Sequence, residues 1–266
     1  IYDFVYGYLA KGGRVYDGYT QRRVTFDFEA AQYVFETYVK LALNAGLVDN
    51  NWPVLEASSL LNNTLALDDE EKRNKYLAYT LYEDTDKQDS LATVAKYFKN
   101  EGDIWPESIN YSLHVSYFSL YLMTTLDRLY PTLKLGQRYP NIGAAFLTFE
   151  QLRYPNGDYP AFGDGNRNYK PDYFEYELAL TSAVINQNNK SSQAFAAKLQ
   201  KAMKQGDYDR GHLAGHSTKA APYYAPLELL WAISDDTLKK TAKAQKNAEL
   251  FTVYPSYHIP FAGFFV

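Results

Sequence analysis

The chain of 266 residues has a formal net charge of -4, 46% hydrophobic residues and no cysteine. This length allows one large domain or two small ones, and the hydrophobic fraction is enough for a sizeable core. The lack of cysteine excludes disulfide scaffolds, thiolate zinc sites and cysteine nucleophiles. The acidic balance, without a basic run of five or more residues, gives no support to a nucleic-acid binder. It leaves an acidic substrate possible, because local clusters of arginine matter more than the sum.

Aromatic residues are unusually frequent, with 26 Tyr and 15 Phe, and they make up 17% of the chain together with Trp. A tyrosine has an apolar body and a polar tip, so it suits wet, half-buried surfaces. Two interpretations stay open at this point. The rings could line a carbohydrate cleft, or they could fill the interfaces between helices.

The spacing of apolar residues predicts helices along most of the chain. Residues 1–24, rich in glycine and tyrosine, are expected to form a loop that could begin with a short helix. Thr25 and Asp68 are predicted to cap the first and the third of the longer helices. The predicted helices cover residues 25–45, 53–66, 69–83, 87–99, 109–129, 139–153, 173–187, 190–205, 225–233 and 235–248.

Only the last segment, FTVYPSYHIPFAGFFV, has the aromatic and β-branched composition of strands. Helices of 12–20 residues with short connections predict an all-α protein built of antiparallel helical hairpins. Helical hairpins with polar loops gathered at one end are compatible with an (α/α) toroid, here incomplete and ending in a short β segment.

The first candidate site is the loop EGDIWPESIN and the helix that follows it. Glu107, Tyr111 and His114 fall at i, i+4 and i+7, a spacing that places a carboxyl, a phenol and an imidazole along one helix face. Such groups could supply an acid, a base and an orienting partner. The alternative is an ordinary helix start, in which the dipole favours Glu107 and packing satisfies His114.

The second candidate site is the loop LRYPNGDYPAFGDGNRNYKPDY. Glycines on both sides of Asp164 let the backbone turn around its carboxyl, and Tyr159 and Tyr169 flank the turn. Arg167 offers a guanidinium fork that suits a carboxylate or a sulfate. Asp164 could instead make only turn hydrogen bonds in a surface loop. A loop this long inside a compact domain is usually functional, which favours the site.

Other motifs argue against several classes of enzyme. His212 and His216 are four residues apart, but neighbouring glycines disfavour a stable helix and no third ligand is near. We therefore predict no metal site and no cofactor. The chain has no nucleophile elbow, P-loop or dinucleotide fingerprint, which argues against serine hydrolases and nucleotide enzymes.

The two loops and the helical pattern resemble the heparinase II/III-like polysaccharide lyases. GDIWPESINY is similar to a loop that stands at the head of a helix in that superfamily, and PNGDYPAFGD resembles its P-(D/N)-G-x-x-P-x-x-G-D loop. The tail HIPFAGFFV looks like the first strand of the β-sandwich that follows the toroid in these enzymes. The resemblance implies a toroid domain over residues 1–250 and the start of a β-sandwich over residues 251–266.

The activity that the resemblance implies is β-elimination of a uronate-containing polysaccharide. Such an enzyme neutralises the uronate carboxyl, takes the proton from C5 and protonates the leaving oxygen. A tyrosine commonly transfers the proton, which selects Tyr159, with Tyr169 as the alternative. Glu107 would meet the substrate carboxyl, which requires that burial or the polyanion keep it protonated. The catalytic candidates are Tyr159, Glu107 and His114, and the substrate-binding candidates are Asn110, Tyr111, Asp164, Arg167, Tyr169 and Trp105.

The sequence departs from the resemblance before Glu107, where relatives have an essential histidine and this chain has Ile104 or Trp105. Another catalytic histidine of relatives lies in the β-sandwich, so we expect this segment alone to be inactive. Two other functions stay open. One is an inverting glycoside hydrolase using Glu107 and Asp164 about 6.5–9.5 Å apart, and the other is a non-catalytic glycan-binding toroid.

The chain shows neither a signal peptide nor an apolar run of about 18 residues. Its abrupt start on an aromatic segment suggests a piece of a longer protein. The resemblance implies a secreted or periplasmic bacterial enzyme. Its partners would be an acidic polysaccharide and the C-terminal β-sandwich domain of the same protein. Heparan sulfate, alginate and other uronates all remain possible substrates.

Overall fold

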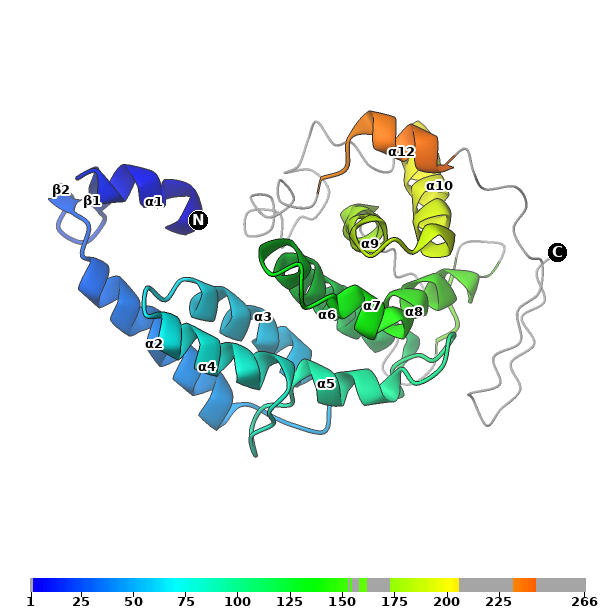
Figure 1. Ribbon diagram of the computed structural model, residues 1–266, viewed down its shortest axis with the longest axis horizontal. Coiled ribbons are helices and arrows are strands. Elements are labelled where there is room, and N and C mark those ends of the chain that lie inside the picture. The colour runs from blue at the N-terminus through cyan, green and yellow to red at the C-terminus, as the bar shows by residue number, and fades with distance from the viewer. Residues whose placement is uncertain (1, 153, 155–157, 162–172, 206–231, 243–266) are drawn as a thin grey trace. The chain divides into compact units, whose positions relative to one another are not determined.

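The computed structural model describes residues 2–152, 154, 158–161, 173–205 and 232–242. Helices dominate these ranges, and the strands within them belong to a single hairpin, so the predicted all-α class is confirmed (Figure 1). The chain divides into two compact units, residues 1–92 and 93–266. The expected β-sandwich start at residues 251–266 lies outside the described ranges and stays a prediction.

The first unit begins with a helix and a hairpin and continues with three longer helices. Its elements are α1 Tyr2–Ala10, β1 Arg14–Asp17, β2 Arg22–Thr25, α2 Phe28–Ala45, α3 Trp52–Leu65 and α4 Glu70–Leu81. Helix α3 packs against both α2 and α4. The core between them is formed by Val39, Leu43, Leu60, Leu67 and Tyr76, with Phe35, Ala42 and Tyr79 at its edge.

The predicted caps of α2 and α4 are wrong by one or two residues. Asp27 and Asp69 cap these helices, and each carboxylate accepts a hydrogen bond from the backbone N–H three residues on, at 2.9 and 3.0 Å. Thr25 is instead the last residue of β2 and pairs with Arg14. The backbone N–H of Asp68 donates to a side chain of α2. Both true caps have the extended backbone that a capping residue needs.

The short helix expected near the start of the chain is present as α1, whereas the loop expected after it is wrong, because this segment forms the hairpin of β1 and β2. The hairpin is held against the end of α1 by Tyr8, whose hydroxyl donates to the carbonyl of Arg14 and accepts from its N–H, both at 3.1 Å. A Cβ at Gly13 would come within 2.3 Å of the Tyr8 ring. Glycine at this position therefore permits the close approach of ring and backbone.

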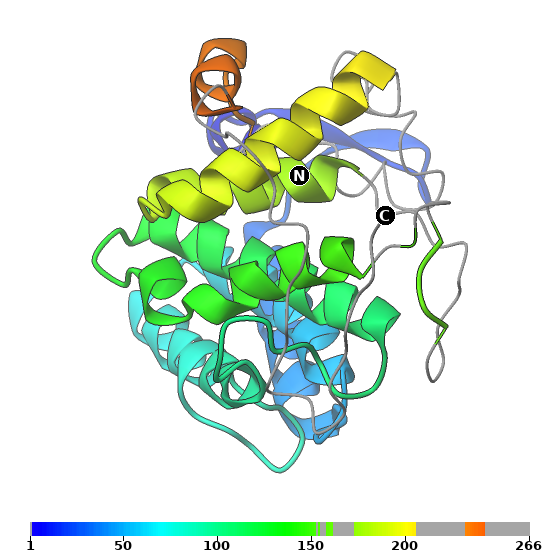
Figure 2. The same ribbon diagram turned by 90° about the vertical axis from the view of Figure 1, so that its right-hand side faces the viewer.

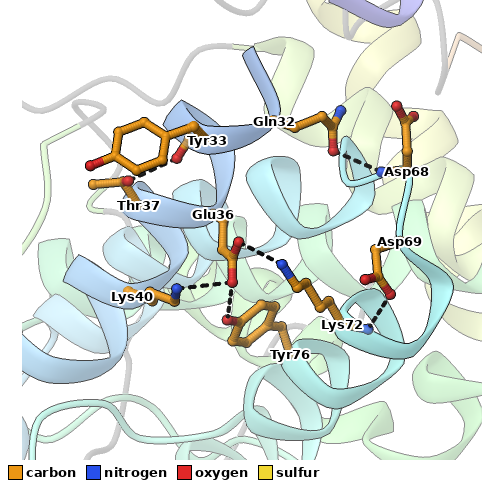
Figure 3. A network of polar contacts seen from close by, with 9 residues as sticks. All are labelled: Gln32, Tyr33, Glu36, Thr37, Lys40, Asp68, Asp69, Lys72 and Tyr76. Carbon is orange, nitrogen blue, oxygen red and sulfur yellow. Dashed lines mark hydrogen bonds and ion pairs between the residues drawn. The ribbon is translucent and has the colours of Figure 1, made fainter. Parts of the chain in front are cut away.

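A polar network joins α2 to α4 in the first unit (Figure 3). Its centre is Glu36, whose carboxylate lies 2.8 Å from the ammonium of Lys72 and 2.9 Å from that of Lys40. The Tyr76 hydroxyl donates to the same carboxylate at 3.1 Å. Hydrogen bonds from Lys72 and Lys40 lower the pKa of Glu36 from 4.5 to about 2.

Replacing Glu36 with Gln is expected to lower the free energy of unfolding by about 1 kcal/mol at pH 7. Because the folded pKa of about 2 lies below the unfolded value of 4.5, the contribution is complete above pH 4.5. It is lost as the pH falls from 4.5 towards 2. Urea unfolding at several pH values measures this, with the exposed Glu83→Gln as control. A gap between wild type and E36Q that stays constant with pH would contradict the assignment.

The second unit is built around a central helix. Its elements are α5 Leu91–Val94, which starts at the unit boundary, the 3₁₀ turn η1 Ala95–Tyr97, α6 Ile109–Leu129, α7 Leu135–Arg138, α8 Pro140–Gln151, α9 Tyr173–Ile185, α10 Asn189–Gln205 and α12 Asp235–Ala242. Helix α6 packs against α7, α8 and α9, and α10 packs against α9 and α12 (Figures 1 and 2). Most side chains of α6 are buried.

The bounds of α6 agree with the prediction, whereas the predicted helix at 87–99 is shorter, since only residues 91–97 are helical. The carboxylate of Asp84 accepts from the N–H and the hydroxyl of Ser90, at 2.8 and 2.7 Å, which holds the chain before α5 in a turn. The predicted helix at 225–233 falls almost wholly outside the described residues.

Asp127 fixes the end of α6 to its neighbours. This buried carboxylate accepts from the backbone N–H groups of Leu135 and Gly136 at 2.6 and 3.0 Å, and so supports the start of α7. It also accepts from the side-chain amide of Asn186, just after α9, at 3.0 Å. A Cβ at Gly136 would lie 2.2 Å from that amide nitrogen, so the glycine leaves room for the contact.

Candidate active site

The loop before α6 is folded onto the helix by polar and aromatic contacts. The Asp103 carboxylate accepts from the backbone N–H of Asn100 at 2.7 Å. The Trp105 ring is 3% exposed and lies 4.6 Å from the ring of Tyr97. The backbone N–H of Trp105 donates to the hydroxyl of Ser112 at 3.0 Å. These contacts define the position of the loop relative to the first turns of α6.

Ser108 begins α6, and this corrects the predicted arrangement of Glu107. The extended backbone of Ser108 and its hydroxyl, which accepts from the N–H of Tyr111 at 3.1 Å, make it the helix cap. Glu107 therefore precedes the helix and does not share a helix face with Tyr111 and His114. It is exposed, and its carboxylate accepts from the indole N–H of Trp105 at 2.6 Å.

Three of the candidate residues lie on the first turns of α6. Asn110 is buried, and Tyr111 and His114 are half-buried. Burial lowers the pKa of His114 below its ordinary value of 6.5, so the imidazole is neutral at neutral pH. A neutral imidazole has one nitrogen that accepts a proton and one that donates a hydrogen bond. This part of α6 therefore presents groups suited to proton transfer.

Tyr159 lies on a separate segment that packs against α8. Its ring stacks on Phe149 with the centroids 4.3 Å apart, and the side chain is fully buried. The backbone N–H of Tyr154 donates to the carbonyl of Asp158 at 2.8 Å, next to Tyr159. Helix α8, which carries Phe149, also packs against α6. The other candidates of the second loop, Asp164, Arg167 and Tyr169, lie outside the described residues.

Besides Asp127, three buried carboxylates in the described part of this unit were not among the predicted site residues. Asp103 belongs to the first loop, and Glu175 and Glu177 lie near the start of α9. Glu177 accepts from the backbone N–H of Ile233 at 2.9 Å, so it holds the segment before α12. Acidic residues inside the apolar patterns GDIW and YFEYELAL are the signal that could have identified them.

Many tyrosines of the second unit are buried between helices, whereas many of the first unit are exposed. In the second unit, Tyr117, Tyr121, Tyr159 and Tyr176 are buried and fill interfaces between helices. In the first unit, many rings face solvent instead. The exposed aromatic side chains of that unit are Tyr6, Tyr8, Tyr16, Tyr19, Tyr33, Tyr38, Trp52 and Tyr82.

No group of three or more His, Asp and Glu side chains within the described ranges could hold a metal ion. His212 and His216 lie outside those ranges. Among the helices that the structure describes, none is both long and apolar enough to cross a membrane.

The part of the chain that contains the polar loop and α6 matches a known protein family. The family model described as endo-acting ulvan lyase 2nd domain matches residues 101–247, more than half of the chain. The chain therefore belongs to the family of endo-acting ulvan lyase second domains. The matched range begins at the first candidate loop and includes the second. The predicted relationship to polysaccharide lyases is confirmed.

A relative with a curated name supports the same conclusion. The chain is 29% identical over 244 residues to an endo-acting ulvan lyase of Formosa agariphila, strain DSM 15362. The alignment covers 86% of this chain and 29% of that protein, so the chain spans less than a third of the length of its relative. No solved structure matches the chain.

Proposed function

We propose that this chain is part of a polysaccharide lyase that cleaves ulvan, a uronate-containing polysaccharide, by β-elimination. The observation that carries the proposal is the family match over residues 101–247, which contains every predicted site residue. The name of the Formosa agariphila relative supplies ulvan as the substrate. The half-buried polar groups at the start of α6 suit the chemistry that this substrate requires.

The reaction needs two proton transfers and the stabilisation of one charge. A base takes the proton from C5 of the uronate, the C4–C5 double bond forms, and the bond from C4 to the glycosidic oxygen breaks. The leaving oxygen then takes a proton. Negative charge develops on the uronate carboxyl as the C5 proton leaves, and hydrogen-bond donors placed there lower the barrier. Asn110 and His114 are the donors that we propose on α6.

We propose Tyr159 as the tyrosine that transfers the proton, because it occupies the matching place in the second loop. Its ring is buried in the described conformation, so this role requires the 158–161 segment to move when the sugar binds. A catalytic group must come within about 2.6–3.2 Å of the proton that it takes, and such contacts often form only in the substrate complex. His114 is the proposed alternative base.

The remaining roles follow from the contacts of the first loop. Glu107 accepts from Trp105 and is exposed, so we propose that it orients the indole beside the sugar rather than meeting the uronate carboxyl. Tyr111 would contact the sugar from the half-buried surface of α6. Asp164, Arg167 and Tyr169 stay proposed substrate-binding residues on the basis of the sequence.

The parent protein is proposed to be secreted or periplasmic, where polymeric substrates are met, and to contain a β-sandwich after this segment. Two observations support the further domain: the relative is more than three times as long as the matched region, and the tail has the composition of a strand.

The direct test is to incubate the full-length parent protein with ulvan, alginate, heparan sulfate and a neutral polysaccharide. β-Elimination produces an unsaturated uronate, so ultraviolet absorbance should rise with ulvan and stay flat with the neutral polymer. New reducing ends without that absorbance would show that the enzyme is a hydrolase and not a lyase. No rise in absorbance and no new reducing ends would favour a non-catalytic glycan-binding domain.

As the alternative base, His114 is expected to give the lyase activity an acidic limb, because only the neutral imidazole can take the C5 proton. Since burial lowers its pKa below 6.5, activity should hold at pH 7 and fall once the pH drops below that lowered value. His114→Gln should reduce kcat on ulvan by about 10²-fold or more and remove this limb. Rates measured from pH 4.5 to 8 test this. The same limb in the variant and the wild type would contradict a role for His114.

A further inference from the structure

The hairpin of the first unit presents a cationic and aromatic face to solvent. Strand pairing places Tyr16 opposite Arg23 and Val15 opposite Val24. Because directly paired residues share a face and neighbours alternate, Arg14, Tyr16 and Arg23 lie on one face and the valines on the other. The valines are half-buried, whereas the Tyr16 side chain is 65% exposed, so the face with Arg14 and Arg23 points outward. Arg22 pairs with Asp17 on the other face.

The turn between the strands adds a second ring. The Tyr19 side chain is 97% exposed, so it adds nothing to the core. The backbone of the turn is held, because the Asp17 carboxylate accepts from the Tyr19 N–H at 2.9 Å and from the Thr20 hydroxyl at 2.5 Å. The turn therefore presents the Tyr19 ring to solvent, where it is accessible for stacking on a ligand. The contacts of Tyr8 with Arg14 hold the whole hairpin on α1 in the same way.

The charge of this segment differs in sign from that of the chain. Residues 11–25 contain four cationic side chains, Lys11, Arg14, Arg22 and Arg23, against the single carboxylate of Asp17. The segment therefore has a net charge of +3 in a chain whose net charge is -4. Such a local patch attracts polyanions, and a guanidinium fork binds a carboxylate or sulfate through two hydrogen bonds.

We propose that the outward face of the hairpin is a binding surface for an acidic polysaccharide strand, separate from the lyase site. A sugar ring stacks on Tyr16, and its carboxylate or sulfate meets Arg23. The paired Cα atoms of these two residues are about 4.5–5.5 Å apart in an antiparallel ladder, within reach of one sugar unit. The surface lies outside the family match at residues 101–247. The inference rests on the proposed function only for the class of ligand, which is an acidic polysaccharide.

The test measures binding of this chain to ulvan by affinity electrophoresis and by calorimetry, with a neutral polysaccharide as the reference probe. Tyr16→Ala and Arg23→Gln should each weaken binding several-fold, and together by about tenfold or more. Tyr19→Ala is a further variant, and because the Tyr19 side chain has no role in the core, its removal should not disturb the fold. Arg14 is left intact because its guanidinium donates to the carbonyl of Arg23. Salt should weaken the binding of the wild type.

The matched controls are Tyr33→Ala, an exposed ring on α2, and Lys75→Gln, an exposed cation on α4. Both should bind ulvan like the wild type. Equal binding by the hairpin variants and the wild type would overturn the inference, as would no binding of ulvan at all. A change of oligomeric state in Tyr16→Ala, measured by sedimentation, would overturn it too, since the face would then be a contact between copies.

Activity separates this inference from the proposed lyase function. In the full-length protein, the hairpin variants should raise KM for polymeric ulvan and leave kcat unchanged. With oligosaccharides of a few units, both constants should stay at the wild-type values. Binding that depends on the hairpin, without any lyase activity, would contradict the proposed function but support the hairpin surface. If the hairpin variants lower kcat on short oligosaccharides, the hairpin acts in the lyase reaction itself, and the inference of a separate surface is wrong.

Discussion

Alanine in place of Asp127 is expected to lower the free energy of unfolding of the second unit by about 3–5 kcal/mol. The buried carboxylate accepts two backbone N–H groups at the start of α7 and the amide of Asn186. Removing it leaves the backbone N–H groups of Leu135 and Gly136 without their acceptor, at a cost of about 1–3 kcal/mol each, whereas the Asn186 amide keeps the carbonyl of Ser182 as a second acceptor. Urea unfolding followed by circular dichroism measures the change.

Two further variants separate charge from geometry at this position. Asp127→Asn keeps one acceptor oxygen and should lose less stability than Asp127→Ala. Asn186→Ala removes one of the three contacts and should lose about 1–2 kcal/mol. A loss below about 1 kcal/mol for Asp127→Ala would mean that water replaces the carboxylate, and would contradict its role in joining α6, α7 and α9.

Phenylalanine in place of Tyr159 is expected to reduce kcat on ulvan by about 10²-fold or more in the full-length protein. The substitution removes only the phenol oxygen and keeps the ring that stacks on Phe149. The fold should therefore be unchanged, and the loss would report the proton transfer alone. The rate of formation of unsaturated uronate measures it.

Tyr154→Phe is the matched control, because this exposed tyrosine belongs to the same segment. It should keep the rate of the wild type. If Tyr159→Phe also keeps that rate, Tyr159 is a packing residue, and the base moves to His114 or Tyr169.

Local signals were enough to predict most of the helices. The bounds of α6 follow from its apolar pattern and from Tyr130-Pro131, which stops the helix. The caps were less certain from sequence because several polar residues compete near each helix start. Asp27 and not Thr25 caps α2, because the pairing of β1 with β2 extends to Thr25. Strand pairing is a non-local fact, and a pattern rich in glycine and tyrosine conceals it.

The candidate site could be predicted only in part. The sequence indicated which loops contain the polar groups, and the family match covers both of them. It could not show that Ser108 caps α6 and leaves Glu107 outside the helix. The burial of Tyr159 was also hidden, because a tyrosine suits a helix interface as well as a sugar cleft, and its stacking on Phe149 is visible only in the structure.

The aromatic residues also give the chain built-in spectroscopic reporters. Trp52, in the first unit, is 51% exposed, whereas Trp105, in the second unit, is 3% exposed. A water-soluble quencher should therefore dim the fluorescence of Trp52 first and leave that of Trp105 until its unit unfolds. In a chain with Trp231 replaced, the two indoles would show whether the units melt together or in turn. Ligands that engage the loop before α6 would change the emission of Trp105 alone.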